Sequence, residues 1–395
     1  MKIIHYCQHV LGIGHYFRSL EIARALWRHR LVLVSGGPAV EVQLPAHVTE
    51  CRLPGLEMDP EFATVAPTDG SRSLEDVQQE RRGLLYSLFE KWAPDLFLVE
   101  LYPFGRKRFG FELVPLLEAI HGNHFGSVKV VCSLRDILVE KRDQPGYEQR
   151  VLALLNRYFH ALLVHADPRL VSLEETFYST GGIRVPIVYT GFVAPKPGSD
   201  MGAGLRTRLG IRDGETLVVA SAGGGRVGEV LLRAVLEAHS QLEGERHRFL
   251  YIFTGPFMNE DSFNSLTKKA ASAPGVRVGR FTSEFLSYLA AADLSVSLAG
   301  YNTCMNILAV GVPALVWPFG QNREQRVRAK KLAALGVVTL LNDQDLEPWQ
   351  LAKLMEEVLS RPRGSTTPSI SLDGAQETAR WLEEGLGKQE GTTND

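Results

Sequence analysis

A histidine follows a glycine-rich turn near the start of the chain, in the run Gly12-Ile13-Gly14-His15. The run lies between an apolar segment, Lys2–Tyr6, which predicts a buried strand, and a helical pattern, Phe17–Trp27. Such a turn directs backbone N–H groups toward a ligand above the sheet, and the helix dipole disfavours an imidazolium. A neutral His15 could accept a proton, as a general base must. The alternative is a polar helix cap, because Phe17 takes the third glycine position of a GxGxxG motif.

Carboxylates stand where two other apolar segments end. Glu100 closes the segment Leu96–Glu100, and Ser133-Leu134-Arg135-Asp136 follows Val128–Cys132. Ligands of open α/β sheets bind at the carboxyl ends of strands. Asp136 or Glu100 could therefore orient His15, as a carboxylate orients the histidine of a catalytic triad. Alternatively, Arg135 and Asp136 pair with each other or cap a helix.

A second glycine turn follows the candidate strand Leu217–Ser221, in the run Ala222-Gly223-Gly224-Gly225-Arg226-Val227-Gly228. Three consecutive glycines allow the backbone to approach a phosphate closely, and Arg226 could add a charge-assisted contact. The alternative is a tight turn between strand and helix that binds no ligand.

The most informative stretch is 297–329. It predicts a strand, a turn at Gly300, a helix that ends at Gly311-Val312-Pro313, the buried strand Ala314–Trp317 and a polar loop. Asn302 and Thr303 stand where we expect a helix N-cap, below N–H groups that could hold a diphosphate.

The string Asp343-Gln344-Asp345 matches a DxD motif, in which two carboxylates can hold a divalent metal ion. It precedes Leu346-Glu347-Pro348, so Asp345 is interpreted as an N-cap with a proline near the helix start. We therefore predict no metal site there.

Strand and helix patterns alternate along the whole chain, which predicts a doubly wound α/β fold. The segment 194–202 is rich in proline and glycine and predicts a linker between two Rossmann-like units. We expect an N-terminal domain at 1–193, a linker at 194–204, a C-terminal domain at 205–362, and a linker with a final helix at 363–388. The polar tail 389–395 is expected to be disordered. The other candidate strands are Leu31–Ser35, Leu162–His165, Ile187–Tyr189, Leu250–Thr254, Val276–Val278, Leu294–Ser297 and Val337–Leu341.

Composition narrows the classes of function. The 395 residues carry 43 basic and 45 acidic side chains, so the chain lacks the basic excess of a nucleic-acid-binding protein. The four cysteines form no CxxC pair and are expected to be buried free thiols. Because the sequence has neither a signal peptide nor a long apolar run, we expect a cytoplasmic protein. The basic cluster Arg106–Arg108 is interpreted as a solvated loop, with peripheral membrane contact as the alternative.

The stretch at 297–329 resembles the C-terminal domain of inverting glycosyltransferases with the GT-B fold. It is similar to the bacterial peptidoglycan N-acetylglucosaminyltransferase, to a group of predicted bacterial glycosyltransferases, and to the signature box of plant UDP-glycosyltransferases. The matching residues are Gly300, Tyr301, Asn302, Thr303, Gly311–Pro313, Glu324 and Gln325. The resemblance continues in order over most of the chain, including the turn with His15 and the glycines at 223–225.

The resemblance implies a metal-independent single displacement without a cofactor. His15 would act as the base near the acceptor, and the final helix would cross back onto the N-terminal domain. The donor would be a UDP-sugar or another nucleotide sugar, with N-acetylglucosamine or another hexose transferred. The acceptor stays open, with a lipid-linked molecule as one option. The implied acceptor-side residues are Gly12, Gly14, Arg18 and Arg135.

The resemblance also implies roles on the donor side. The glycines Gly223–Gly225, together with Asn302 and Thr303, would hold the diphosphate. Arg280 and Phe281 would pack on the base. Glu324 and Gln325 would bind hydroxyls of the transferred sugar.

Asn306 stands where the family usually has a glutamate that binds the ribose diol. An amide offers one acceptor group and one donor group in place of two carboxylate oxygens, so weaker ribose binding is expected. This departure favours one rival function, a non-catalytic nucleotide-sugar-binding subunit. A nucleotide-sugar hydrolase or epimerase, which would share the fold, is the other alternative.

Overall fold

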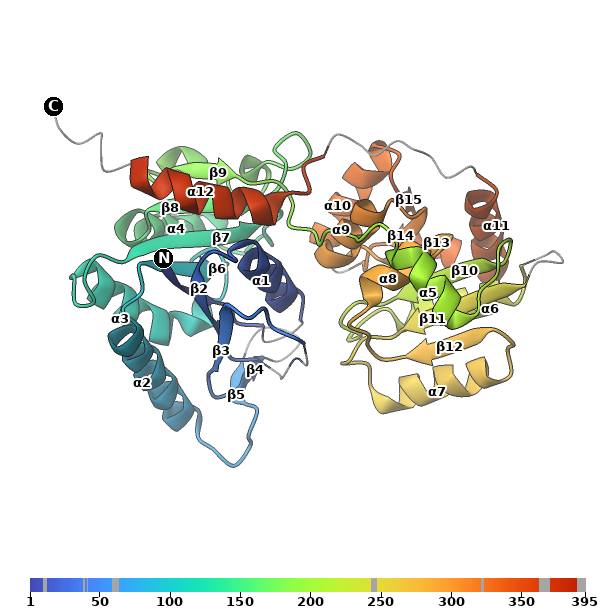
Figure 1. Cartoon of the computed structure of the whole chain (residues 1–395), viewed down its shortest axis with the longest axis horizontal. Helices are drawn as coiled ribbons and strands as arrows, with labels where there is room; N and C mark the ends of the chain where they lie inside the picture. Colours follow the sequence, from blue (N-terminus) through green and yellow to red (C-terminus); the bar gives the residue numbers. More distant parts are fainter. Residues whose placement is uncertain are drawn as a thin grey trace. The chain divides into compact units, whose positions relative to one another are not determined.

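The computed structural model describes residues 1–9, 13–37, 40, 42–58, 64–242, 247–320, 323–361 and 370–388. The chain forms two compact units (Figure 1). Unit 1 combines Met1–Val193 with the chain from Ser371 onward, and unit 2 is Ala194–Ile370. The predicted α/β fold with two doubly wound units is confirmed by the two parallel sheets described below.

Unit 1 contains a seven-stranded parallel sheet in the order β3-β2-β1-β6-β7-β8-β9. Its central strands are buried along their whole length, which explains their almost continuous apolar sequences. The predicted strands of this half are present, but β3 was missed because its residues are mostly half-buried or exposed. A separate antiparallel pair joins β4 (Leu56–Met58) to β5 (Val65–Pro67). The sheet strands are β1 (Lys2–Tyr6), β2 (Arg30–Ser35), β3 (Val48–Arg52), β6 (Leu96–Glu100), β7 (Lys129–Arg135), β8 (Ala161–His165) and β9 (Ile187–Tyr189).

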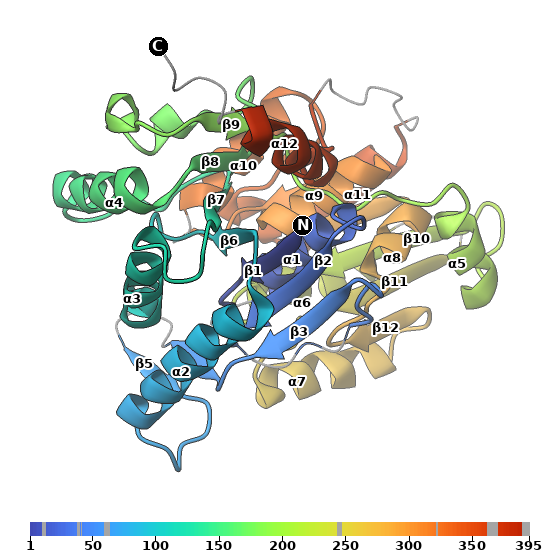
Figure 2. The ribbon, with the colours of Figure 1, turned by 60° about the vertical axis from the view of Figure 1, so that its left-hand side comes forward.

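Helices cover both faces of this sheet, as a parallel sheet requires. Figure 2 shows α1 (Gly14–Ala25) and α12 (Gly374–Lys388) on one side and three helices on the other. These three are α2 (Leu74–Trp92), α3 (Gly110–His121) and α4 (Gln144–Tyr158), and the 3₁₀ turns are η1 (Lys107–Phe109), η2 (Leu173–Glu175) and η3 (Thr180–Gly182).

The first helix begins and ends earlier than the expected range Phe17–Trp27. Because α1 stops at Ala25, Trp27, which we expected to end the helix, lies beyond it and is 63% exposed. The final helix was expected to end at about Gly385, and it extends to Lys388.

Unit 2 contains a six-stranded parallel sheet in the order β12-β11-β10-β13-β14-β15. Among the α-helices, α6 contacts α7 and α11, whereas α8 contacts α5 and α9, so these helices form two groups. The strands are β10 (Thr216–Ser221), β11 (Arg248–Phe253), β12 (Val276–Gly279), β13 (Leu294–Leu298), β14 (Ala314–Trp317) and β15 (Thr339–Leu340). The helices are α5 (Met201–Leu209), α6 (Glu229–His239), α7 (Glu260–Ala271), α8 (Phe285–Ala291), α9 (Tyr301–Val310), α10 (Arg323–Ala334), η4 (Asp343–Leu346) and α11 (Pro348–Leu359).

One of the expected linkers overlaps a helix. The segment predicted as a linker, 194–204, already contains the start of α5 at Met201. Segments 362–369 and 389–395, where we expected a second linker and a disordered tail, lie outside the described residues.

The cysteines are free thiols, as predicted, and Cys7, Cys132 and Cys304 are buried, whereas Cys51 is half-buried. Within the described ranges, none of the helices combines the length and the apolar character needed to cross a bilayer.

Candidate functional site

His15 lies at the start of α1, and its Nδ1 is 2.7 Å from Oε1 of Glu100. Glu100 ends β6, the strand that pairs with β1. Arg18, one helical turn after His15, donates to the same oxygen of Glu100. The side chains of Arg18 and Glu100 are almost fully buried, whereas that of His15 is 16% exposed. His15 is therefore the member of the group that is open to solvent.

The hydrogen bond to Glu100 determines how His15 is protonated. A carboxylate only accepts, so we assign the proton to Nδ1, which leaves Nε2 with a free lone pair. Burial lowers the pKa of His15 to about 3; Glu100 opposes this shift, while Arg106 and Arg18 add to it. Burial alone would raise the pKa of Glu100, but His15 and Arg18 hold it below its ordinary value. The pair is thus a neutral imidazole on an ionised carboxylate, which can accept a proton at Nε2.

The structure distinguishes between the two carboxylates that we considered for His15. The acidic side chain in contact with His15 is Glu100, while Asp136 lies fully buried just after β7. The expectation that 133–136 follows a strand is wrong for its first three residues, because β7 runs on to Arg135. Ser133 instead lies within the sheet, with its hydroxyl 2.7 Å from Nε2 of His165.

The remaining acceptor-side candidates are divided between described and undescribed residues. Gly14 is the first residue of α1, and Arg18 is buried against Glu100. Gly12 lies outside the described residues.

The glycine turn of unit 2 has two distinct parts. Gly223 has φ +61°, and a Cβ added to it would meet nothing within 4 Å. Gly225 has φ +89°, and its Cβ would lie 2.5 Å from the carbonyl oxygen of Thr254. Gly225 is thus required for packing against a neighbouring loop, while the open position of Gly223 leaves room for a ligand. Arg226 is exposed, with its guanidinium 5.3 Å from the ring centre of Phe257.

The N-terminus of α9 differs from our expectation by two residues. Its N-cap is Gly300, in an extended conformation, and this residue has no side chain with which to cap the helix. Asn302 and Thr303, predicted at the cap, are instead the second and third residues of the helix. Asn306 lies four residues after Asn302, so the two amides share one face of α9, and both are half-buried.

Of the two residues implied to bind the nucleobase, Arg280 makes contacts within unit 2 and Phe281 is exposed. Arg280 donates to the carbonyl of Met258 at 2.7 Å and to Glu260 at 2.6 Å, and lies 4.1 Å from the ring centre of Phe263. Its guanidinium therefore holds the β12 end against α7. Phe281, beside it, is 42% exposed.

The pair implied for the sugar hydroxyls lies in the first turn of α10. Gln325 accepts a hydrogen bond from the backbone N–H of Phe319, with an N···O distance of 3.1 Å, so it also shapes the loop before the helix. Glu324 is half-buried beside it.

Two features of unit 2 were missed at the sequence level. Arg328 on α10 is 1% exposed and donates to the carbonyl of Ala299, just before the N-cap of α9. Its only sequence signal is its position four residues before Leu332 on the buried face of α10.

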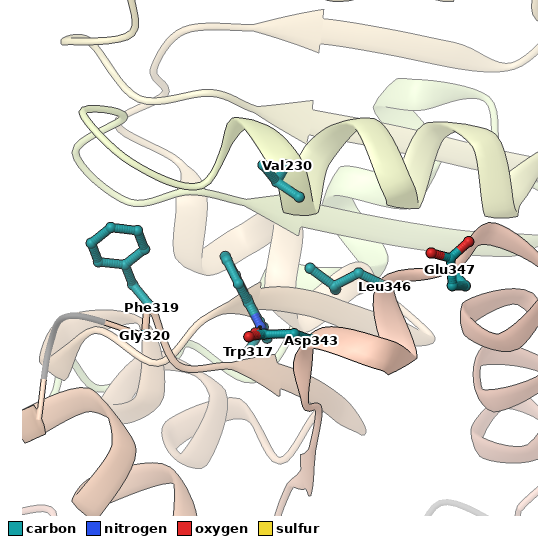
Figure 3. Close-up of a pocket in the computed structure, with 7 residues that line it drawn as sticks. All are labelled: Val230, Trp317, Phe319, Gly320, Asp343, Leu346 and Glu347. Atoms are coloured by element: carbon teal, nitrogen blue, oxygen red, sulfur yellow. Dashed lines mark hydrogen bonds between the residues drawn. The ribbon is translucent and has the colours of Figure 1, made fainter.

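The second feature is a cavity of about 440 Å³ beside the start of α6 (Figure 3). It is lined by Val230, Trp317, Phe319, Gly320, Asp343, Leu346 and Glu347. This lining contains no basic side chain, so the cavity does not suit a diphosphate.

The DxD string has structural contacts of its own. Asp343 accepts a hydrogen bond from the indole of Trp317 at 2.9 Å, and Asp345 accepts from the backbone of Asn342. Asn342 is the N-cap of the turn η4, and Glu347 is the N-cap of α11, which begins at Pro348, so the predicted cap at Asp345 is wrong. Across the residues that the structure describes, no three His, Cys, Asp or Glu side chains gather as a metal site would need.

The comparisons with known proteins that follow all involve glycosyltransferases. Residues 218–379 match the model of the glycosyltransferase family 28 C-terminal domain. Two similar curated proteins bear the name UDP-N-acetylglucosamine–N-acetylmuramyl-(pentapeptide) pyrophosphoryl-undecaprenol N-acetylglucosamine transferase. The protein of Caldicellulosiruptor saccharolyticus is 24% identical over 57% of this chain and 58% of its own length. That of Desulforudis audaxviator is 29% identical over 60% of this chain and 63% of its own length. The matches thus span less than two thirds of these relatives.

Solved structures share the fold over nearly the whole chain. A calicheamicin glycosyltransferase has a TM-score of 0.61 at 16% identity and covers 99% of both chains. The MurG protein of Acinetobacter baumannii has a TM-score of 0.53 at 15% identity and covers 96% of this chain and 95% of its own. At these identities the likeness shows the GT-B fold alone.

Proposed function

We propose, from the premise that this chain is a GT-B glycosyltransferase with a family 28-like C-terminal domain, that it moves a sugar from a nucleotide-diphosphate donor to an acceptor hydroxyl. The reaction would be a metal-independent single displacement. The acceptor oxygen attacks the anomeric carbon, its proton passes to the base, and the nucleoside diphosphate leaves.

The contact between His15 and Glu100 carries this proposal. A neutral imidazole whose Nδ1–H is held by a carboxylate presents Nε2 as a proton acceptor, the arrangement that a general base needs. This contact also disfavours the non-catalytic alternative, since a binding subunit has no use for an oriented base. Arg18 keeps Glu100 ionised, so Glu100 would act on the reaction through His15 and serve as a positioning residue.

On the donor side we propose that the diphosphate binds between the turn at Gly223 and the N-terminus of α9, whose N-cap is Gly300. The first N–H groups of a helix have no acceptor within it, and the dipole favours negative charge there. These features would stabilise the leaving diphosphate where other enzymes use a metal ion. Asn302 and Thr303 would add side-chain contacts, and Glu324 and Gln325 would bind the sugar.

The names of the relatives suggest the finer identity of the substrates. We propose UDP-N-acetylglucosamine as the first donor to test, and a polyprenol-linked acceptor, because both occur in those names. Such an acceptor would bring the enzyme into peripheral contact with a membrane.

Donor binding and base function are tested separately. A ligand that binds only the folded state raises the melting temperature. We expect one nucleoside diphosphate from a panel to stabilise the protein, with the same shift in the presence of a chelator. If none does, or if stabilisation requires a divalent metal, the metal-free donor site is wrong.

The base is tested by His15→Ala, which should lower kcat by about 100-fold or more while donor binding is kept. His29→Ala is the matched control, since His29 lies just beyond α1 and pairs with Glu383. Equal activity of the two variants would exclude His15 as the base.

A further inference from the structure

Arg328 on α10 is a buried cation to which the proposed reaction assigns no role. It shares the inward face of the helix with Ala329 and Leu332, and its side chain is 1% exposed. Taking a guanidinium out of water costs free energy unless its donors find acceptors inside the protein. The groups that accept from Arg328 or contact it therefore indicate what this side chain does for unit 2.

Two contacts of Arg328 lie at the turn between β13 and α9. Its Nη1 donates to the carbonyl of Ala299 at 3.0 Å. Its guanidinium lies 5.5 Å from the ring centre of Tyr301, the first residue of α9. Ala299 and Tyr301 flank Gly300, the N-cap of the helix. Arg328 thus contacts the turn on both sides of the residue at which α9 begins.

The hydrogen bond from Arg328 fixes the orientation of the peptide between Ala299 and Gly300. This peptide is trans, so its carbonyl and its N–H point to opposite sides. Because the carbonyl of Ala299 points toward the buried guanidinium, the N–H of Gly300 points away from it. Gly300 is half-buried, and its N–H donates no hydrogen bond to any residue that the structure describes. A backbone donor is therefore left available at the start of α9.

This N–H lies where an anion is favoured. A cation on the carbonyl oxygen polarises the peptide and strengthens the hydrogen bond that its N–H can donate. The first N–H groups of α9 follow directly and have no acceptor within the helix. The helix dipole adds positive potential at the same end. One phosphate group can therefore accept from Gly300 and from the first turn together.

We propose that Arg328 is a positioning residue for the sugar-nucleotide donor, because it turns the N–H of Gly300 toward the diphosphate. The presence of a diphosphate at α9 rests on the proposed function, whereas the orientation of the peptide by Arg328 does not. Arg328 is too deeply buried to touch the ligand itself. It acts through the backbone of Ala299 and Gly300, so its loss should weaken anion binding even in a folded protein.

The N–H of Gly300 is tested with Gly300→Pro and Gly300→Ala. Gly300 has φ −65° and ψ 151°, and a proline ring imposes the same φ while it removes the N–H. A Cβ at this position would lie 3.9 Å from the hydroxyl oxygen of Thr303, an ordinary contact, so alanine fits and keeps the N–H. Titration calorimetry with inorganic pyrophosphate should show at least about 10-fold weaker binding for Gly300→Pro than for Gly300→Ala. Equal affinities would overturn the proposal.

Arg328 itself is tested with Arg328→Met and Arg328→Lys, at a temperature at which both variants are folded. We expect Arg328→Met to bind pyrophosphate at least about 10-fold more weakly than the wild type. Arg328→Lys keeps a charged donor for the carbonyl of Ala299 and should recover most of this loss. Lys330→Met, which removes an exposed charge from the same helix, should change the affinity less than about twofold. A merely structural arginine would lower the melting temperature and leave the affinity of the folded protein unchanged, which would overturn the proposal.

Hydrogen exchange of the ligand-free protein separates this proposal from the proposed function. The amide of Cys304 donates to the carbonyl of Gly300 at 2.9 Å and reports on the first turn of α9. We expect Arg328→Met to speed exchange at this amide by at least about 10-fold, while Lys330→Met leaves it unchanged. If exchange changes in this way but neither pyrophosphate nor any nucleoside diphosphate binds the wild type, the proposed function fails and the orienting role of Arg328 stands. Unchanged exchange in Arg328→Met would contradict that role.

Discussion

At the scale of single residues, unit 1 buries histidines that the proposed mechanism does not use. His5 on β1 is fully buried, and burial lowers its pKa from 6.5 to about 4. His165 on β8 lies between the hydroxyls of Ser133 and Thr190, and burial lowers its pKa to about 3. Both side chains are therefore neutral in the folded protein at pH 7.

We predict that acid destabilises unit 1 through these histidines. Between pH 6.5 and about 4 the unfolded chain binds a proton at His5 that the folded chain does not, so stability falls as pH falls through this window. The slope approaches about 1.4 kcal/mol per pH unit for each such group. His5→Leu should remove the contribution of His5 to this pH dependence of stability. Hydrogen exchange of β1 should then change less between pH 7 and pH 5 than in the wild type.

His121→Gln provides the comparison, since His121 is exposed at the end of α3. An unchanged pH dependence in His5→Leu would mean that His5 does not contribute to acid sensitivity.

At the scale of elements, a buried ion pair joins α2 to α3. Arg81 donates to both oxygens of Glu112 at 2.8 and 2.6 Å, and both side chains are fully buried. Tyr6 at the end of β1 also donates to Glu112, and Gln8 accepts from Arg81. The pair thus connects two helices to the carboxyl end of β1.

We predict that Glu112→Gln lowers the free energy of unfolding by about 3–5 kcal/mol, because it leaves the Arg81 charge buried without its counter-ion. Urea unfolding would measure the change. Glu118→Gln, an exposed position on the same helix, should cost less than about 1 kcal/mol. Similar losses of unfolding free energy in the two variants would show that the buried ion pair contributes no more to stability than an exposed carboxylate.

The two glycines of the unit 2 turn allow a second prediction at this scale. Gly225→Ala should destabilise unit 2 by several kcal/mol, because its Cβ would meet the Thr254 carbonyl at 2.5 Å. Gly223→Ala meets no atom within 4 Å and should cost only about 1 kcal/mol, the strain of its positive φ. Hydrogen exchange of β10 and β11 would show which of the two variants is less stable. Equal effects would contradict the packing role of Gly225.

At the scale of the whole molecule, the chain leaves unit 1 at Val193 and returns to it at Ser371. The departing and returning segments lie side by side: Phe192 and Ser371 share a hydrogen bond of 2.8 Å, and Val193 pairs with Asp373. Asp167 accepts a further hydrogen bond from the N–H of Ser371. The helix that follows, α12, then packs against α1 with Ala375, Ala379 and Leu382 in the core of unit 1.

We predict that Leu382→Ala lowers the stability of unit 1 by about 2–5 kcal/mol and leaves unit 2 unchanged. Leu382 is 1% exposed, although only 13 residues follow it in the sequence. Hydrogen exchange resolved by peptide would show the loss in α1 and β1. A loss confined to unit 2, or shared equally, would contradict the division of the chain.

The sequence by itself determined the class of fold and the places where chemistry is expected. The buried strands of both sheets are almost continuously apolar, and this pattern can be recognised without knowledge of any long-range contact. The same pattern predicts that His15 follows one such strand and that Glu100 ends another. Strands with half-exposed residues, such as β3, carry no comparable signal and were missed.

Only the tertiary structure decided which side chains meet. Glu100 and Asp136 are equivalent in sequence, each beside a strand end, and the pairing of β1 with β6 brings Glu100 to His15. Arg106 and Arg108 are equally basic neighbours, yet Arg106, in a turn with positive φ, is half-buried and Arg108 is exposed. Gly223 and Gly225 differ only through the loop that packs against one of them. Local pattern specifies periodicity and turn chemistry, whereas contacts between residues far apart in the chain depend on strand order and backbone direction, which no local pattern encodes.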